Sequence, residues 1–251
     1  IMDSPVIAAC GGGTNSAAMI IRMVNNGERL DVALFADTGG EKPWTYDFLK
    51  VLSDWMVSKG YPEIVTVRSP SRTLEEDCLI RKSLPSVVFG KNMKTCSQRF
   101  KTQPQNKWLN HFPPAIEAWK NGKKVIKCIG YDAGELHRAK EYKDDKYINR
   151  YPLIEWWMGR DECIEEIKQT GLPPPGKSSC FFCPNSKTHE IIALSDDLKE
   201  RAIKMENNAK LNKVVGLGYT WKWSDLIRAD RDQMKMFQEP PPIPCMCDDG
   251  N

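Results

Sequence analysis

Apolar runs alternate with amphipathic stretches along the first half of the chain. Continuous apolar runs are expected to form strands at 6–9, 32–36, 64–67 and 125–129. Apolar residues at helical spacing follow the first two runs, over 17–24 and 44–59. The run at 32–36 is wholly apolar, as in a strand covered on both faces. This alternation predicts an α/β fold built on a doubly wound parallel sheet.

The pattern is less regular in the rest of the chain. A helix is expected from Pro104 through Trp108, and residues 151–156 are predicted to form a fixed, extended segment. Amphipathic spacing predicts a short helix at 161–170 and longer helices at 189–208 and 224–237.

The sharpest change in composition comes near Pro173. Residues 173–177 have the sequence Pro-Pro-Pro-Gly-Lys, which forms a stiff connector. We therefore expect two parts, an α/β domain at 1–171 and a mainly helical C-terminal subdomain at 172–251. The subdomain is small and carries a Cys-x-x-Cys and a Cys-x-Cys arrangement.

Composition narrows the class of protein. The chain has 251 residues, 41% of them hydrophobic, and no apolar run approaches the length of a membrane span. Its nine cysteines are an odd number, and no stretch resembles a signal peptide, which together argue against a disulfide framework. These features predict a soluble, cytoplasmic protein that does not bind membranes.

Basic residues gather in one segment although the net charge is only +3. Nine lysines and arginines occur from Lys91 to Lys127, where Glu117 is the only acid. This asymmetry favours a ligand that bears phosphate, either a nucleotide or a nucleic acid. A solvated basic face is the alternative interpretation.

A glycine-rich turn separates the first strand from the first helix. It comprises Gly11, Gly12, Gly13, Thr14, Asn15 and Ser16. Glycines let backbone N–H groups approach an anion, and the N-terminus of the following helix carries partial positive charge. The turn is therefore a candidate phosphate-binding loop, and a plain turn is the alternative.

Polar residues also follow the second and fourth strands, at the edge where open parallel sheets bind ligands. The residues after the second strand are Asp37, Thr38 and Gly39, and those after the fourth are Gly130, Asp132, Glu135 and Arg138. Helix capping is the alternative role for Thr38. Arg138 is suited to bind a phosphate or carboxylate, and an internal salt bridge with Glu135 is its alternative.

Five cysteines are candidate metal ligands. The spacing of Cys180 and Cys183 lets two thiolates face one metal ion. Cys245 and Cys247 would complete a four-thiolate set that favours structural Zn²⁺. Cys96 would instead give three thiolates, which favour an iron–sulfur cluster with one open iron. Buried cysteines without a ligand are the third interpretation.

Two pairs of tryptophans are candidate stacking platforms. Trp156 and Trp157 are adjacent, and Trp221 and Trp223 are two residues apart. An exposed indole stacks well on a nucleobase. Packing in the core is the favoured alternative for both pairs.

Taken in order, these motifs resemble those of the PP-loop superfamily of adenine nucleotide α-hydrolase-like proteins. The similarity is to the phosphoadenosine-phosphosulfate reductase-like branch, whose small members occur in phages and prophages. The resemblance spans residues 5 to about 190 and rests on Gly11–Ser16, Asp37–Gly39 with Pro43 and Thr45, Cys96–Pro104, Gly130–Arg138, Tyr151–Leu153 and Cys180–Pro184.

The chain departs from the family pattern in two respects. Gly11 stands where a serine is common, and Asn15 stands where an aspartate is common. The Glu-Cys-Gly-x-His tail that carries the nucleophile of true sulfonucleotide reductases is absent. The missing tail argues against a reductase of sulfate assimilation.

The resemblance implies an enzyme that binds ATP or a related adenine nucleotide and cleaves it at the α-phosphate. The expected reaction is adenylation with release of pyrophosphate, coupled to sulfur transfer or nucleic-acid modification. One alternative is a sulfonucleotide reductase that acts on a PAPS- or APS-type nucleotide with Cys245 or Cys247. The other is a non-catalytic protein that binds nucleotides or nucleic acid.

The resemblance also implies roles for individual residues. Asp37 and Thr38 are expected near the adenine or ribose, and Ser16, Arg99, Lys101 and Arg138 are the expected catalytic residues. It favours Cys96 as the partner of the Cys180 and Cys183 pair, with [4Fe-4S] or Zn²⁺ as the bound group. Mg²⁺, a nucleic acid, a sulfur donor protein and a second copy of the chain are left open as further partners.

Overall fold

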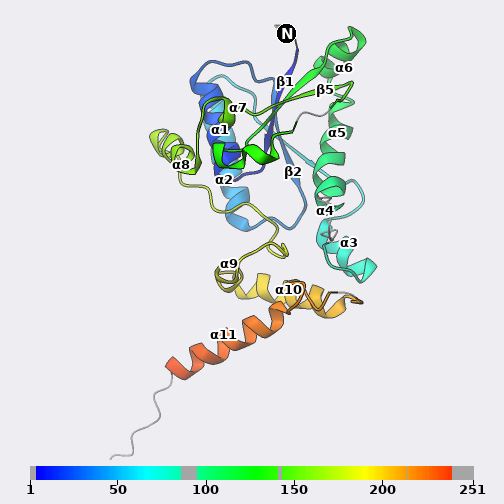
Figure 1. The fold of residues 1–251 in the computed structure, drawn as a ribbon, viewed down its shortest axis with the longest axis vertical. Coiled ribbons are helices and arrows are strands. Elements are labelled where there is room, and N and C mark those ends of the chain that lie inside the picture. Colours follow the sequence, from blue (N-terminus) through cyan, green and yellow to red (C-terminus); the bar gives the residue numbers. More distant parts are fainter. Residues whose placement is uncertain (1–3, 86–94, 141–142, 213, 239–251) are drawn as a thin grey trace, which may run out of the picture.

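A computed structural model describes residues 4–85, 95–140, 143–212 and 214–238. Its centre is a five-stranded sheet in the order β3-β2-β1-β4-β5, in which every neighbouring pair is parallel (Figure 1). The strands are β1 (Val6–Cys10), β2 (Val32–Asp37), β3 (Ile64–Arg68), β4 (Val125–Ile129) and β5 (Tyr147–Arg150). The predicted α/β fold with a parallel sheet is confirmed.

Helices cover both faces of the sheet. Alternate side chains of β1 and β2 enter two hydrophobic cores, with Ala8 and Phe35 in one and Ile7 and Leu34 in the other. The first core is closed by α1 (Thr14–Asn25), α2 (Pro43–Ser58) and α8 (Arg160–Gln169), and the second by α5 (Gln103–Leu109) and α6 (Pro113–Lys120). All of β2 is buried as a result, as expected for its apolar run.

Residues 151–156 do not form the extended segment that the sequence predicted. Pro152 begins a short helix, α7 (Pro152–Glu155), because a proline fits the first helical turn without losing a hydrogen bond. β5, α6 and α3 (Leu74–Arg81) were not predicted from the sequence, although Thr73 and Glu76 form a capping box at the start of α3.

The basic segment forms a helical unit with a π-helical turn inside it. α4 (Thr95–Ser97) leads into the π-helix η1 (Gln98–Thr102), which continues into α5. The helix expected from Pro104 through Trp108 is therefore confirmed. Single π turns inside α-helices often mark functional sites. Beyond β4, the chain forms a short 3₁₀ helix, η2 (Ala133–Arg138).

The last third of the described chain is helical and lies below the sheet in Figure 1. Its helices are α9 (Thr188–Ile192), α10 (Asp196–Asn208) and α11 (Trp223–Gln238), so the helix predicted at 189–208 is interrupted. Phe181 and Trp223 pack in a core that also contains Leu74 and Phe100. The division of the chain at 171 and 172 stays a prediction. No helix in the described part of the chain is long and apolar enough to cross a membrane.

Candidate functional site

The strand order of the sheet reverses between β1 and β4. β2 and β3 extend the sheet on one side of this point, and β5 extends it on the other. In open α/β sheets, ligands bind beyond the carboxyl ends of the strands at such a point. A cavity of about 580 Å³ lies there, lined by Ala9 and Cys10 at the end of β1 and by Ile129 and Gly130 at the end of β4.

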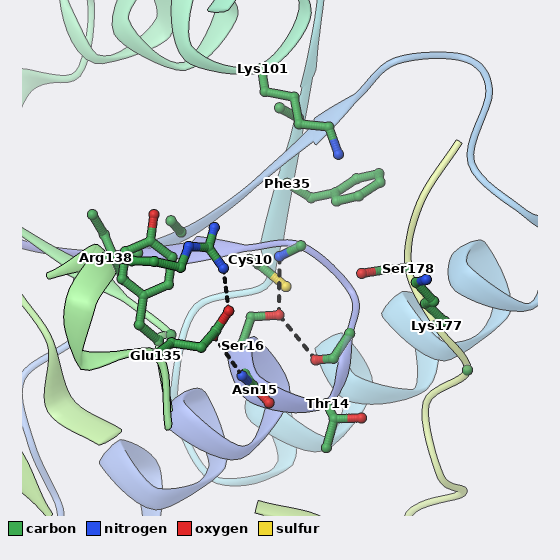
Figure 2. A pocket seen from close by; sticks show the side chains of 18 of the residues that line it. Cys10, Thr14, Asn15, Ser16, Phe35, Lys101, Glu135, Arg138, Lys177 and Ser178 are labelled. Atoms are coloured by element: carbon green, nitrogen blue, oxygen red, sulfur yellow. Dashed lines mark hydrogen bonds and ion pairs between the residues drawn. The ribbon is translucent and has the colours of Figure 1, made fainter. Parts of the chain in front are cut away.

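The glycine-rich turn forms the floor of this cavity. Gly12 has a φ angle of 71°, which favours glycine, and Gly13 is the N-cap of α1. In this described helix no side chain caps the N-terminus, and the first turn contains no acidic residue. Ser16 Oγ accepts the Gly11 N–H at 3.1 Å and donates to the Gly13 carbonyl at 3.1 Å (Figure 2). The loop therefore presents the positive end of α1 to the cavity.

Glycines allow two segments to pack closely against this loop. A Cβ on Gly130 would lie 3.0 Å from the carbonyl oxygen of Asn15 and 3.0 Å from the backbone nitrogen of Ser16. A Cβ on Gly13 would lie 2.6 Å from Ser178 Oγ. The end of β4 and the segment around Ser178 therefore both contact the start of α1 directly.

Asn15 is bound by neighbours of both charges. Its side-chain amide donates to Asp132 Oδ2 at 2.9 Å and to Glu135 Oε2 at 3.2 Å. Its Oδ1 accepts a hydrogen bond from the Arg160 guanidinium at 3.0 Å. An aspartate at this position would place a third carboxylate beside Asp132 and Glu135. The uncharged amide of Asn15 therefore suits these surroundings, whereas a carboxylate would be repelled by Asp132 and Glu135.

Four cationic side chains line the cavity: Lys101, Arg138, Arg160 and Lys177. Arg138 forms an ion pair with Glu135 (Figure 2). Its guanidinium also stacks over the ring of Tyr131. The predicted internal salt bridge is thus present, and it holds the guanidinium at the cavity wall. Lys177 pairs with Glu190 at 2.7 Å. Lys101, Arg138 and Lys177 are thus each paired with a carboxylate, and Arg160 donates a hydrogen bond to the uncharged side chain of Asn15.

Lys101 extends from η1 into the cavity (Figure 2). Its Nζ lies 3.0 Å from Oε1 of Glu41, whose side chain is fully buried. Burial lowers the pKa of Lys101, but the charge and hydrogen bond of Glu41, together with the nearby Cys180 and Cys183, outweigh burial and leave this pKa above its usual value. Lys101 is therefore a protonated cation at neutral pH. Oε2 of Glu41 is buried and makes no hydrogen bond within the described residues.

Arg99 lies away from the cavity although it is two residues from Lys101. Its guanidinium binds Asp77 at 3.1 Å, on α3. The π-helical turn therefore directs Lys101 toward the sheet edge and Arg99 toward α3. Of the predicted catalytic residues, the structure brings Ser16, Lys101 and Arg138 together at the cavity and places Arg99 elsewhere.

Asp37, which the structure places as the last residue of β2, and the two residues after it do not line the main cavity. The Asp37 carboxylate accepts hydrogen bonds from the Gly39 N–H at 2.7 Å, from the Tyr46 hydroxyl at 2.8 Å and from Arg68 at 2.8 Å. Asp37 and Gly39 instead line a smaller cavity of about 180 Å³. Thr38 is buried and contacts Cys180. Gly12 and Asp132 also lie outside the main lining, which does include Gly11, Gly13, Thr14, Asn15, Ser16, Gly130 and Glu135.

The described cysteines do not assemble a metal-binding group. Cys180 is buried and its Sγ lies 3.1 Å from Thr38 Oγ1, while burial raises the pKa of its thiol to about 12. Cys96 and Cys183 are partly buried at the edge of the same core. No group of three or more His, Cys, Asp or Glu side chains in the described ranges is arranged to hold a metal ion. Cys245 and Cys247 lie outside the described residues.

Several cavity residues were missed by the sequence analysis. They are Gln105, Tyr131, Arg160, Lys177 and Ser178. Lys177 ends the proline-rich connector and Ser178 follows it, so the stiffness of the connector was the one available signal for a fixed position. No comparable signal in the sequence indicated Arg160, at the start of α8.

Comparisons with known proteins add a structural likeness. No protein-family model matches the chain, and no curated protein matches it. Among solved structures, it is similar to the U34-tRNA thiolase NcsA from Methanococcus maripaludis with its [4Fe-4S] cluster. The identity is 13% and the TM-score is 0.45, over 99% of this chain and 77% of that chain. The function proposed below rests on the residues of this chain.

Proposed function

We propose that the chain binds ATP or a related adenine nucleotide in the cavity between β1 and β4 and transfers its adenylyl group to an acceptor. A nucleophile of the acceptor would attack the α-phosphorus, and the bond to the β-phosphate would break to release pyrophosphate. One observation supports this above all. The uncapped N-terminus of α1 and four cationic side chains converge on one cavity at the switch point of a parallel sheet.

Each part of the cavity has a role in this proposal. The backbone N–H groups of Gly13, Thr14 and Asn15 bind phosphate oxygens at the positive end of α1. Ser16 holds the loop in the required shape through its two backbone hydrogen bonds. Lys101 and Arg138 compensate the negative charge that develops on the leaving pyrophosphate.

The finer assignment is to the PP-loop superfamily, in its phosphoadenosine-phosphosulfate reductase-like branch. Its support is that the motifs at Gly11–Ser16 and Gly130–Arg138, far apart in the chain, meet at one cavity. Sulfur transfer or nucleic-acid modification would be the coupled step. The alternative of a sulfonucleotide reductase depends on Cys245 or Cys247, which lie outside the described residues.

No Mg²⁺ ligand is assigned. The carboxylates of Asp132 and Glu135 both accept hydrogen bonds from Asn15, and Glu135 also pairs with Arg138. These carboxylates do not fit a cation site, because they already face three N–H donors. Among the described residues no three ligating side chains are brought together around a metal, and no step here depends on a metal or an iron–sulfur cluster. A group held by Cys96, Cys180 and Cys183 stays a prediction for elemental analysis of the purified protein.

Removal of the Lys101 ammonium is expected to weaken ATP binding about tenfold, since a charge-assisted contact to phosphate is lost. Because Lys101→Met alone would leave the buried Glu41 carboxylate unpaired, the variant is built as Lys101→Met with Glu41→Gln. Its dissociation constant is compared with that of Glu41→Gln alone by isothermal titration calorimetry with ATP.

The matched control is Lys107→Met, which removes an exposed lysine of the same segment outside the cavity. It should bind ATP as the unmodified protein does. Arg99→Met should also bind normally, against the sequence-based role of Arg99. Failure of the unmodified chain to bind ATP would overturn the proposal. ATP binding without pyrophosphate release for any acceptor would favour the non-catalytic alternative.

A further inference from the structure

Trp157 is the most exposed large hydrophobic side chain in the described part of the chain. Its side chain is 76% exposed, whereas Trp223 is fully buried. Its backbone is also unusual, with a φ angle of 52° in the left-handed region. Bulky residues rarely adopt this conformation, and strained residues often have functional roles.

The turn that holds Trp157 does not need an indole. The Trp157 N–H donates to the Ile154 carbonyl at 3.1 Å, and the Met158 N–H donates to the Leu153 carbonyl at 2.8 Å. This pair of bonds is the Schellman motif that ends many helices, and its left-handed position is usually occupied by glycine. Trp157 occupies that position after α7. Neither the turn nor packing accounts for the indole, because the side chain is largely exposed.

Trp157 lies next to one wall of the proposed nucleotide cavity. The carbonyl of Met158 accepts the Ala133 N–H at 2.8 Å, which joins the turn to the start of η2. α7 packs against both η2 and α1 (Figure 1). Arg160 lines the cavity and is three residues beyond Trp157, so their Cα atoms are at most about 11 Å apart. The ring itself is not part of the cavity lining.

Exposed charges of both signs lie on the segments joined to the Trp157 turn, with Glu155, Asp161 and Glu162 as the exposed acids. Arg138, Lys140 and Arg160 are exposed cations on η2, directly after it, and at the start of α8. We refer to these three residues as the basic strip. Exposed aromatic rings beside a cationic track are the arrangement by which proteins bind single-stranded nucleic acids, since bases stack on the rings and phosphates follow the cations.

We propose that Trp157 is a stacking platform for a base of a single-stranded nucleic acid whose backbone follows the basic strip. This inference rests on the proposed function, because the strand would be the acceptor presented to the nucleotide cavity. The position of the ring outside the cavity lining favours a base of the acceptor over the adenine of the nucleotide.

The test is Trp157→Gly, because glycine suits the left-handed position and removes the ring without disturbing the turn. Binding of a fluorescein-labelled RNA of about 12 nucleotides, within the usual range of site sizes, is measured by fluorescence anisotropy without ATP. The same sequence is tested as DNA. Trp157→Gly should bind roughly tenfold to a hundredfold more weakly, with an unchanged or higher melting temperature. Trp157→Phe should retain most of the affinity.

The matched control is Ile80→Ala, which trims another exposed apolar side chain, 65% exposed, on α3. It should leave the affinity for both oligonucleotides unchanged. Equal affinity of Trp157→Gly and the unmodified protein, or no binding by the unmodified protein, would overturn the proposal. So would weaker ATP binding by Trp157→Gly, which would assign the ring to the nucleotide.

Loss of a dimer in Trp157→Gly, seen by sedimentation, would also overturn the platform, because a second copy of the chain would then cover the ring. The oligonucleotide measurement does not contain ATP, so it is independent of the nucleotide site. If ATP fails to bind but the oligonucleotide depends on Trp157, the proposed function fails and the platform stands. If ATP binds and the oligonucleotide does not, the reverse holds.

Discussion

Gly130→Val is expected to abolish ATP binding, with a loss of at least about a hundredfold in affinity. The Cβ of any residue at this position would lie 3.0 Å from three backbone atoms at the start of α1, and the branches of valine come closer still. Backbone atoms of a strand and a helix cannot move aside as a flexible side chain does. The end of β4 and the N-terminus of α1 must therefore separate. The backbone N–H groups of the loop then no longer point toward one phosphate position.

The position of Gly11 provides the matched control. A Cβ there would have ordinary contacts, 3.8 Å from Ser16 Oγ and 3.9 Å from Ser178 Oγ. Gly11→Ala is therefore expected to bind ATP within a few-fold of the unmodified protein, although it changes the loop itself. Titration calorimetry measures the affinities of both variants for ATP, and circular dichroism checks that both variants are folded. Gly130→Val with normal ATP affinity would show that the nucleotide does not depend on this junction.

The strands of the first half were predictable because their environment is simple. β2 is buried along its whole length, so its sequence is apolar throughout and could be identified without its neighbours. β5 is an edge strand of four residues with the sequence Tyr-Ile-Asn-Arg, and the side chain of Ile148 is 46% exposed. An exposed edge strand does not need an apolar run, so the sequence contained no clear signal for it.

The phosphate-binding loop was predictable because its chemistry is local. Glycines, an uncapped helix start and the preceding strand are all contained between Val6 and Ser16. The opposite wall depends on contacts between distant segments. Lys177 and Ser178, at the end of the proline-rich connector and directly after it, reach the cavity from across the predicted domain boundary. No local pattern reports such a contact.

Arg99 and Lys101 show a second limit of sequence reasoning. Both are cations in the same basic segment, and the sequence analysis gave them the same role. Their directions differ because the π turn η1 sets the rotation of each side chain, and a π turn has no reliable sequence signature. Asp77 then binds Arg99, and Glu41 binds Lys101. These ion-pair partners determine which of the two cations faces the cavity and which faces α3.

Glu206→Ala is expected to lower the free energy of unfolding by about 4 kcal/mol, because it leaves two buried and one partly buried backbone donor without an acceptor. Oε1 of Glu206 accepts the N–H groups of Leu217 and Trp223 at 2.8 and 2.9 Å, and Oε2 accepts that of Ser224 at 3.0 Å. The residue is only 3% exposed. This carboxylate therefore joins α10 to the start of α11, and thermal denaturation followed by circular dichroism measures the loss.

Glu200→Ala is the matched control, since Glu200 is an exposed acid on the same helix. It should change the free energy of unfolding by less than about 0.5 kcal/mol.

The shape of the Glu206→Ala transition also tests the predicted division of the chain at 171 and 172. A separate subdomain would melt first, in a distinct step. Because Lys177 and Ser178 line the cavity and Phe181 shares a core with Leu74 and Phe100, we expect ATP binding to weaken in that first step. A variant that melts as the unmodified protein does would show that Glu206 does not hold this junction.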